Sequence, residues 1–153
     1  MSLDVAAPLA GTAVVLTEVP DPVFSRQLVG PGTALDPDRA DGADVTAVAP
    51  VDGTIAKAHP HAFIVATEAG PAVLVHLGLD TVGLAGKGFT LHVQEGDTVT
   101  AGDPVVTWNP AGIEAAGLSP LVPVVVLDGQ ESDLSGVEAG THLDAGDVLL
   151  TWC

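Results

Sequence analysis

Two segments place three histidines where they can do chemistry. The stretch HPHAF covers residues 59–63, and VLVHLGLDTVGL covers residues 73–84. In the second, His76 interrupts an apolar run and is followed closely by Gly78 and Asp80. If this run is a strand, alternation puts Leu74 and His76 on one face and the intervening valines on the other, which faces the core. The pattern therefore predicts an imidazole that stands beside a leucine on an apolar platform.

The chemistry that suits such an imidazole is nucleophilic attack on phosphorus. Its unperturbed pKa of about 6.5 leaves one ring nitrogen with a free lone pair at neutral pH. We expect donors for the phosphoryl oxygens from His61 and from the backbone near Gly78, where glycine permits close approach. Asp80 is a candidate for capping the turn or for holding one imidazole tautomer. The strand pattern alone is equally compatible with a histidine that is satisfied within the core.

The HPH motif has a second interpretation, as a set of metal ligands. A His-x-His spacing on a strand points both rings to one face, so His59, His61 and His76 could form a zinc site. Pro60 indicates a strand end or an edge strand. The alternative function is therefore a zinc-binding hydrolase of the lysostaphin type. Against it, such enzymes are exported and use an upstream histidine, whereas we expect no signal peptide in MSLDVAAPLAG and no histidine precedes His59.

Charge and composition exclude several classes of function. Four basic residues stand against twenty acidic ones, for a net charge of −16. No basic stripe is available for nucleic acid or for an anionic membrane, so we expect no nucleic-acid partner. No apolar run approaches the ~18 residues of a membrane span, and the single cysteine, Cys153, forms no internal bridge. We expect a cytoplasmic protein with one domain over residues 1–153 and no cofactor.

The chain is predicted to be all-β. Eighteen glycines and twelve prolines separate short apolar runs, and helical periodicity is nearly absent. One short helix is predicted at Pro110–Gly117, a helical turn at Pro22–Ser25 and a polar loop at Gly32–Asp44. The predicted strands are Thr12–Leu16, Asp44–Ala49, Gly53–Ala58, Ala62–Thr67, Ala72–Leu77, Thr98–Thr100, Pro104–Trp108, Leu121–Leu127 and Val148–Trp152.

Two internal echoes indicate pseudo-symmetry. APLAGT at residues 7–12 recurs as APVDGT 42 positions later, and VQEGDTVTAGDPVVTW at residues 93–108 recurs as VEAGTHLDAGDVLLTW 44 positions later. Gly-Asp pairs ahead of apolar strands are turn signals. Like turns at opposite edges favour an antiparallel β sandwich, or barrel-sandwich, with short helical turns. His92 and His142 are predicted to be ordinary surface residues.

The turn sequence EGDTVTAGD is also similar to the turns of biotinyl and lipoyl carrier domains. Such a domain attaches its cofactor to a lysine in a tight hairpin. This chain offers only Lys57, between alanines in a predicted strand, and Lys87, between glycines. We therefore expect neither cofactor.

Five blocks of the chain resemble the glucose-family enzyme IIA proteins, which are phosphocarriers of the bacterial phosphoenolpyruvate-dependent sugar phosphotransferase system. Their family fold is an antiparallel β sandwich with short helical turns. The VHLGLDTVGLAGKGF block is the most specific of the five. In family order they are APLAGTAVVLTEVPDPVFSRQLVGPGTAL (7–35), VAPVDGTIAKAHPHAF (48–63), VLVHLGLDTVGLAGKGF (73–89), VQEGDTVTAGD (93–103) and SPLVPVVV (119–126).

The resemblance implies roles for particular residues. His76 falls on the phosphorylated histidine of the family, which takes the phosphoryl group on Nε2 from the general carrier HPr. His61 falls on the second active-site histidine, which hydrogen-bonds the phosphoryl group. Asp80 falls on the acid that follows the nucleophile.

The resemblance also implies partners. Val23, Phe24 and Val29 match a hydrophobic rim that docks both the donor and the acceptor. The phosphoryl group then passes to a cysteine of an enzyme IIB domain, here on a separate membrane permease, and from there to a sugar. Family members also bind regulated enzymes, in some cases through a metal that bridges the histidines matched by His61 and His76. No other metal is expected.

Departures from the family pattern lie around the same site. The family usually has a small polar residue where this chain has His59. We expect His59 either to replace the missing hydroxyl as a hydrogen-bond partner or to add a third imidazole. Leu74 and Leu77 stand where aromatics often flank the nucleophile. We expect His59, Leu74 and Gly78 to contact substrate or partner.

Overall fold

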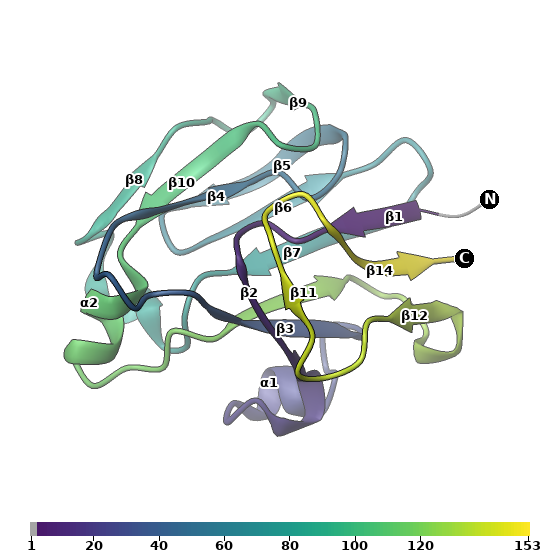
Figure 1. Cartoon of the computed structure of the whole chain (residues 1–153). Helices are drawn as coiled ribbons and strands as arrows, with labels where there is room; N and C mark the ends of the chain where they lie inside the picture. The colour runs from purple at the N-terminus through teal and green to yellow at the C-terminus, as the bar shows by residue number, and fades with distance from the viewer. Residues whose placement is uncertain (1–2) are drawn as a thin grey trace.

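The computed structural model describes residues 3–153, which form antiparallel strands joined by short turns (Figure 1). Its helical segments are η1 (Leu16–Glu18), α1 (Pro22–Ser25), η2 (Thr81–Leu84), α2 (Pro110–Ala115) and η3 (Glu131–Asp133). Its strands are β1 (Leu3–Ala6), β2 (Gly11–Val15), β3 (Gly32–Pro37), β4 (Val45–Val48), β5 (Gly53–His59), β6 (Ala62–Ala66), β7 (Ala72–His76), β8 (Phe89–Leu91), β9 (Thr98–Val99), β10 (Pro104–Trp108), β11 (Val122–Val126), β12 (Leu134–Gly136), β13 (His142–Leu143) and β14 (Val148–Trp152).

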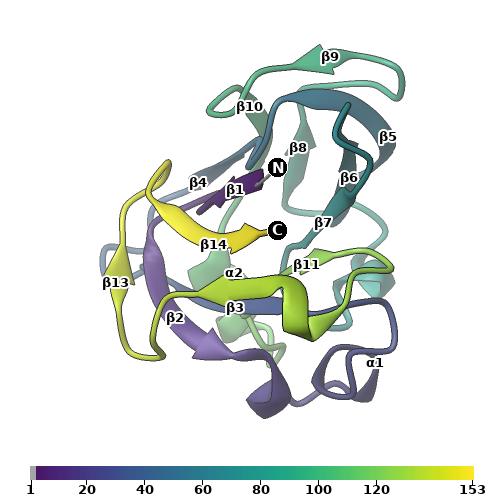
Figure 2. The same cartoon turned by 90° about the vertical axis from the view of Figure 1, so that its right-hand side faces the viewer.

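The strands form three sheets that share one core. The largest has the order β13-β2-β3-β11-β7-β6-β5-β9, and the two smaller ones have the orders β4-β10-β8 and β1-β14-β12. Side chains from all three sheets meet in the main core, among them Val5, Val75 and Val106. Figure 2 shows β1 and β14 side by side, as their pairing requires. The predicted all-β antiparallel sandwich is therefore confirmed.

Strand β11 is buried on both faces, which explains its unbroken apolar sequence. All five of its residues are buried. Val124 belongs to the main core, whereas Val125 belongs to a second cluster with Phe24 and Leu79. This second cluster lies where η1 and α1 cover the outer face of the large sheet (Figure 1). A strand covered on both faces needs no polar alternation.

The two sequence echoes correspond to one repeated arrangement of backbone. Ala49 exchanges two backbone hydrogen bonds, both of 2.9 Å, with the turn at residues 102–103. Ala7, 42 positions earlier, makes the same pair of bonds, of 2.9 and 2.7 Å, with the turn at residues 146–147. Strands β9 and β13 begin 44 positions apart and form the two ends of the eight-stranded sheet. The predicted recurrence of like turns at opposite edges is thus confirmed.

The predicted loop at Gly32–Asp44 is wrong in its first half. Strand β3 occupies Gly32–Pro37, where it pairs with β2 on one side and β11 on the other. Its residues Thr33, Ala34 and Leu35 are buried, as expected for a strand that lies between two others. The short sequence GTALDP has turn-forming residues at both ends and no alternation of apolar and polar residues. The strand was therefore not predicted. Four further short strands, β1, β8, β12 and β13, were also not predicted.

The two predicted helical segments are present, each with a capping side chain. Asp21 Oδ1 accepts a hydrogen bond of 3.0 Å from the Val23 amide at the start of α1. Asn109 Oδ1 accepts one of 2.9 Å from the Gly112 amide at the start of α2. Helix α2 ends at Ala115, two residues before the predicted end. Proline follows the cap in both, as its fixed φ favours.

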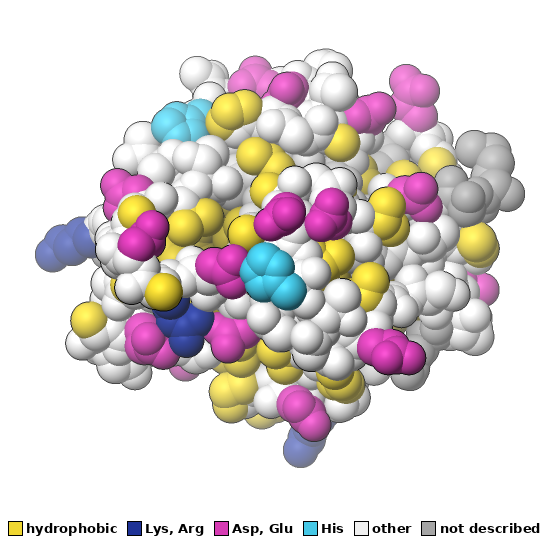
Figure 3. Space-filling view, in the orientation of Figure 1, with side chains coloured by type: hydrophobic (Ala, Val, Ile, Leu, Met, Phe, Trp, Pro, Cys, Tyr) yellow, Lys and Arg dark blue, Asp and Glu magenta, His cyan; other side chains and the backbone are white. Residues whose placement is uncertain are grey.

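Acidic side chains are spread over the face seen in Figure 3, where lysine and arginine are few.

The exposed His142 forms an ion pair with Asp38. Its Nε2 atom lies 2.7 Å from Asp38 Oδ2, and this hydrogen bond and the charge of Asp38 raise the pKa of His142. No helix within residues 3–153 is long and apolar enough to cross a membrane.

The repeated turns yield a test of the fold. Gly102 and Gly146 have φ of 98° and 94°, where an L side chain is strained, although open space surrounds both. Gly102→Ala and Gly146→Ala should each lower the free energy of unfolding by about 1–2 kcal/mol, and to a similar extent, as measured by urea denaturation. Gly83→Ala is the matched control, because Gly83 has equally open surroundings but no positive φ. Unchanged stability in both turn variants would contradict the repeated geometry.

Candidate functional site

His76 is the last residue of β7, and the strand alternates as predicted. Val73 and Val75 are fully buried in the main core, whereas Leu74 and His76 are partly exposed on the opposite face. Leu74 packs against the second cluster, which includes Phe24. The histidine therefore stands on an apolar platform at the edge of the cluster beneath α1.

A backbone carbonyl sets the tautomer of His76. The Nδ1 atom lies 2.5 Å from the carbonyl oxygen of Gly78, which can only accept a hydrogen bond. Nδ1 must therefore carry the proton, and Nε2 of the neutral ring keeps a free lone pair. Gly78 has φ of 77°, and a Cβ there would lie 2.7 Å from Cγ2 of Thr81. Only glycine fits this turn. The absence of a side chain at Gly78 therefore allows the backbone conformation that points the Gly78 carbonyl at His76.

Asp80 does not perform either of the functions that its position suggested. Its side chain makes no capping hydrogen bond to η2, and the Gly78 carbonyl rather than a carboxylate holds the His76 tautomer. Asp80 is exposed and lies in the left-handed region with φ of 59°. Its effect on His76 is a favourable charge interaction with the protonated ring.

The environment of His76 contains opposing influences on its pKa. Burial lowers the pKa below its ordinary value, and this influence is the largest. The hydrogen bond to Gly78 and the charges of Asp21 and Asp80 act in the opposite direction. The Phe24 ring contributes to the burial, since its centroid lies 5.2 Å from that of His76 at 60°. The net result is an imidazole that stays neutral, with Nε2 unprotonated, at neutral pH.

Asp21 also influences the pKa of His76, although its position in the sequence did not mark it as a site residue. It caps α1, and its charge raises the pKa of His76. The signal was present, because an aspartate followed by proline marks the start of a helical turn. Its proximity to His76 depends on how α1 folds back over the sheet, which the local sequence does not reveal.

His61 lies beside His76 as the sequence predicted. The Pro60–His61 turn joins β5 to β6 and brings the two ring centroids to 5.4 Å, at an interplanar angle of 72°. The carbonyl of His61 also accepts a hydrogen bond of 2.7 Å from the Leu77 amide, which ties the turn to the end of β7. Burial and the neighbouring His76 and His59 lower the pKa of His61. Pro60 thus marks a strand end, as predicted.

His59 contacts His61 by stacking. The two ring centroids are 5.7 Å apart and the planes differ by 23°. Among the described residues the ring hydrogen bonds of histidines belong to His76, His92 and His142. His59 therefore adds a third imidazole and does not replace the missing hydroxyl as a hydrogen-bond partner of His61.

The backbone after His76 is largely committed to structure. The Leu77 amide donates to His61, and the Leu79 amide donates to the Ser119 carbonyl at 2.9 Å. These two amides are therefore not the phosphoryl donors that we expected near Gly78. They instead hold the turn rigidly, which keeps the Gly78 carbonyl aimed at His76.

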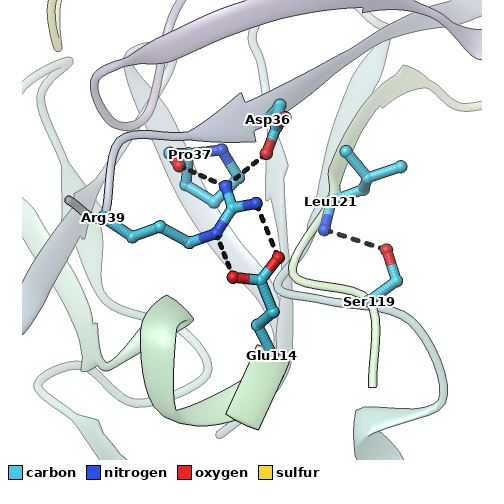
Figure 4. Close-up of polar contacts among 6 residues, drawn as sticks. All are labelled: Asp36, Pro37, Arg39, Glu114, Ser119 and Leu121. Carbon is cyan, nitrogen blue, oxygen red and sulfur yellow. Dashed lines mark hydrogen bonds and ion pairs between the residues drawn. The ribbon is translucent and has the colours of Figure 1, made fainter. Parts of the chain in front are cut away.

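Arg39 lies between β3 and helix α2 and is held by two carboxylates (Figure 4). Arg39 donates two hydrogen bonds to Glu114 on α2, of 3.1 and 2.8 Å, and also contacts Asp36 and the Pro37 carbonyl. The connection after α2 carries Ser119, whose carbonyl holds Leu79. The link from β3 through Arg39 to α2 therefore anchors the segment whose Ser119 carbonyl holds the turn after His76.

Exposed apolar side chains surround the site. Val23 on α1, Leu28 just after it and Val82 on η2 are 43%, 67% and 65% exposed. They belong to the segments that flank His76, whereas the expected rim residue Phe24 is only 5% exposed and packs against the His76 ring. Val29 is half-buried in the second cluster. Leu28 and Val82 were missed because an isolated exposed apolar residue has no sequence signature.

The histidines do not form a metal centre. Within residues 3–153 no group of three or more histidine, cysteine, aspartate or glutamate side chains is arranged to hold an ion. The zinc hydrolase alternative therefore has no support in the geometry. The carrier alternative has no support either, because neither of the chain's two lysines lies in a tight hairpin. Lys57 lies within β5 opposite Ile64, and Lys87 lies in the turn that joins the helical segment η2 to β8.

Comparison with known proteins agrees with this geometry. Residues 3–132 match the family described as phosphoenolpyruvate-dependent sugar phosphotransferase system, EIIA 1. The fold is similar to glucose permease IIA from Mycoplasma capricolum, with a TM-score of 0.87 and 35% identity over 99% of this chain and 96% of that one.

Similar proteins occur both as single components and within longer chains. The glucose-specific EIIA component of Halalkalibacterium halodurans is 39% identical over 94% of this chain and 82% of its own length. The glucose-specific EIIBCA component of Corynebacterium glutamicum is 40% identical over 90% of this chain, which spans only 20% of that longer protein. On these grounds the chain belongs to the EIIA 1 family of the phosphoenolpyruvate-dependent sugar phosphotransferase system.

Proposed function

We propose that the chain is a phosphocarrier in which Nε2 of His76 accepts a phosphoryl group from phosphorylated HPr and passes it to an enzyme IIB domain. The observation that carries this proposal is the hydrogen bond from His76 Nδ1 to the Gly78 carbonyl. It leaves Nε2 as the free nucleophilic nitrogen on a partly buried apolar platform. The family assignment is consistent with phosphoryl transfer through a phosphohistidine.

The transfer is an in-line displacement at phosphorus. The Nε2 lone pair forms the new P–N bond while the bond between phosphorus and the donor breaks, and the donor keeps that electron pair. Positive charge develops on the imidazole, and the Nδ1–H bond to the Gly78 carbonyl stabilises it. His61 is placed to donate a ring N–H to a phosphoryl oxygen. The reverse sequence delivers the group to the next nucleophile.

Docking is expected to use the apolar residues that flank His76. Val23, Leu28 and Val82 would be covered in the complex, and Val29 and Leu74 support them from the second cluster. Covering these side chains excludes water from the phosphoryl group and limits hydrolysis. The acidic Asp21 and Asp80 beside His76 suit a partner face that carries basic side chains.

The partners follow from the family architecture. Relatives whose names read EIIBCA and EIICBA carry an EIIA portion together with EIIB and EIIC portions. We infer that residues 1–153 form one EIIA domain, that it passes the phosphoryl group to a IIB domain, and that HPr is the donor. Binding of regulated enzymes according to phosphorylation state would use the same face. We therefore also propose that the protein acts in the cytoplasm, where these proposed partners would meet it.

The proposal that His76 is the phosphoryl acceptor is tested by replacing this residue with alanine. His76→Ala should abolish acceptance of the phosphoryl group from phosphoenolpyruvate, enzyme I and HPr, because no other imidazole within residues 3–153 has its Nδ1 held by a backbone carbonyl. Intact-mass spectrometry should show one acid-labile phosphoryl group on the unchanged chain and none on the variant. His92→Ala is the matched control, since His92 is an exposed histidine hydrogen-bonded to Thr107. A stable phosphohistidine in His76→Ala would refute the assignment.

The second histidine is tested by separating acceptance from donation. His61→Ala should still accept the phosphoryl group but should pass it to a IIB domain at least about a hundredfold more slowly, because a donor to the transferring oxygens is lost. Rapid-quench measurement of the loss of phosphohistidine gives the rate. Equal donation rates for His61→Ala and the unchanged chain would remove His61 from the transfer step.

The lowered pKa values give a pH test. Because burial lowers the pKa of His76 and His61, both rings should stay neutral as pH falls through 6.5 and should protonate only at lower pH. Histidine ring NMR should therefore show both titrating below His142, whose pKa is raised by Asp38. The rate of phosphoryl acceptance should fall along the His76 titration. Titration of His76 above His142 would contradict the burial argument.

A further inference from the structure

His59, His61 and His76 are brought together by strand register. His59 at the end of β5 pairs with Ala62 on β6, and Ala62 pairs in turn with His76 on β7. Directly paired residues of antiparallel strands point to the same face of the sheet. His59, Ala62 and His76 therefore lie side by side on one face of strands β5, β6 and β7, with the small alanine in the middle.

The alanine leaves a slot between the two outer imidazoles. Neighbouring strands are about 4.8 Å apart, so the backbones of His59 and His76 are separated by about 10 Å. The ring of His61, from the turn just before Ala62, occupies this space. Its centroid lies 5.7 Å from that of His59 and 5.4 Å from that of His76. It meets the first nearly face to face, at 23°, and the second nearly edge to face, at 72°.

Packing is what orients the His61 ring. The ring hydrogen bonds made by histidines in the described part of the chain belong to His76, His92 and His142, so none fixes the plane or tautomer of His61. The backbone of the turn is fixed, since the His61 carbonyl is bonded to Leu77. The side chain is free to rotate about χ1 unless a neighbour blocks it. His59 closes the side of the slot that faces away from His76.

We propose that His59 is a positioning residue whose ring forms the outer wall of this slot and holds His61 in the orientation that serves phosphoryl donation from His76. The inference rests on the proposed function and deepens it, because His59 acts only through His61. The relevant property of His59 is its flat aromatic face, not a proton or a hydrogen bond. An aromatic ring that cannot titrate should therefore replace it, whereas a methyl group should not.

The test compares His59→Ala with His59→Phe, and uses His92→Ala as the control for loss of an exposed histidine. Donation from phospho-His76 to a IIB domain should slow about tenfold in His59→Ala, with KM for the IIB domain within about twofold of the unchanged chain. His59→Phe and His92→Ala should keep at least half of the original rate. In a His61→Ala background, His59→Ala should have no further effect, because the ring that it positions is already absent.

A second readout does not require phosphorylation. NMR couplings of His61 in the unphosphorylated protein should report one χ1 rotamer in the unchanged chain and in His59→Phe, and averaging over rotamers in His59→Ala. If the unchanged chain accepts no phosphoryl group but the couplings behave in this way, the positioning inference stands and the proposed function fails.

Three results would overturn the inference. The first is an unaltered donation rate and an unaltered His61 rotamer in His59→Ala. The second is an equal loss of rate in His59→Ala and His59→Phe, which would assign the effect to a proton or hydrogen bond of His59. The third is a rise in KM alone, which would make His59 a contact for the partner and not a support for His61.

Discussion

The hydrogen bond between His76 Nδ1 and the Gly78 carbonyl is the interaction on which the site depends. It decides which nitrogen carries the proton and therefore which one can attack. The bond requires a turn that only glycine can make, since a Cβ would collide with Thr81. The Leu79 amide, bonded to Ser119, keeps that turn in place. Rigid backbone thus performs a function that many histidine sites assign to a carboxylate.

Burial lowers the pKa of His76 and the neighbouring carboxylates raise it, and both effects suit phosphoryl transfer. Burial beside Phe24 keeps the ring neutral and nucleophilic before transfer. The charges of Asp21 and Asp80 favour a positive charge on the ring, which the proposed transfer would create as the P–N bond forms. A fully buried ring would resist that charge, and an exposed ring beside carboxylates would be protonated too readily to act as a nucleophile. His76, at the edge of the second cluster, is only partly buried and therefore lies between these two extremes.

Sequence alone predicted those features that follow from local periodicity. Alternation around His76 predicted the correct faces for Leu74 and the flanking valines, and the apolar run at Leu121–Leu127 predicted a strand where β11 lies. It failed for β3, whose place between β2 and β11 is set by pairing with distant segments. It also offered Asp80 as a cap of the turn or as the holder of the His76 tautomer, and neither role is seen, because the direction of the Gly78 backbone carbonyl cannot be read from a sequence.

The pseudo-symmetric framework explains why the site lies where it does. Strands β2 and β5 begin 42 positions apart, in the two halves that share the repeated turns. In one half the strand continues to His59 and the HPH turn. In the other it stops at Val15, and the chain enters η1 and α1, which bring Phe24 against His76. Phe24 and His61, whose ring centroids lie 5.2 and 5.4 Å from that of His76, therefore both come from stretches in which the two halves differ.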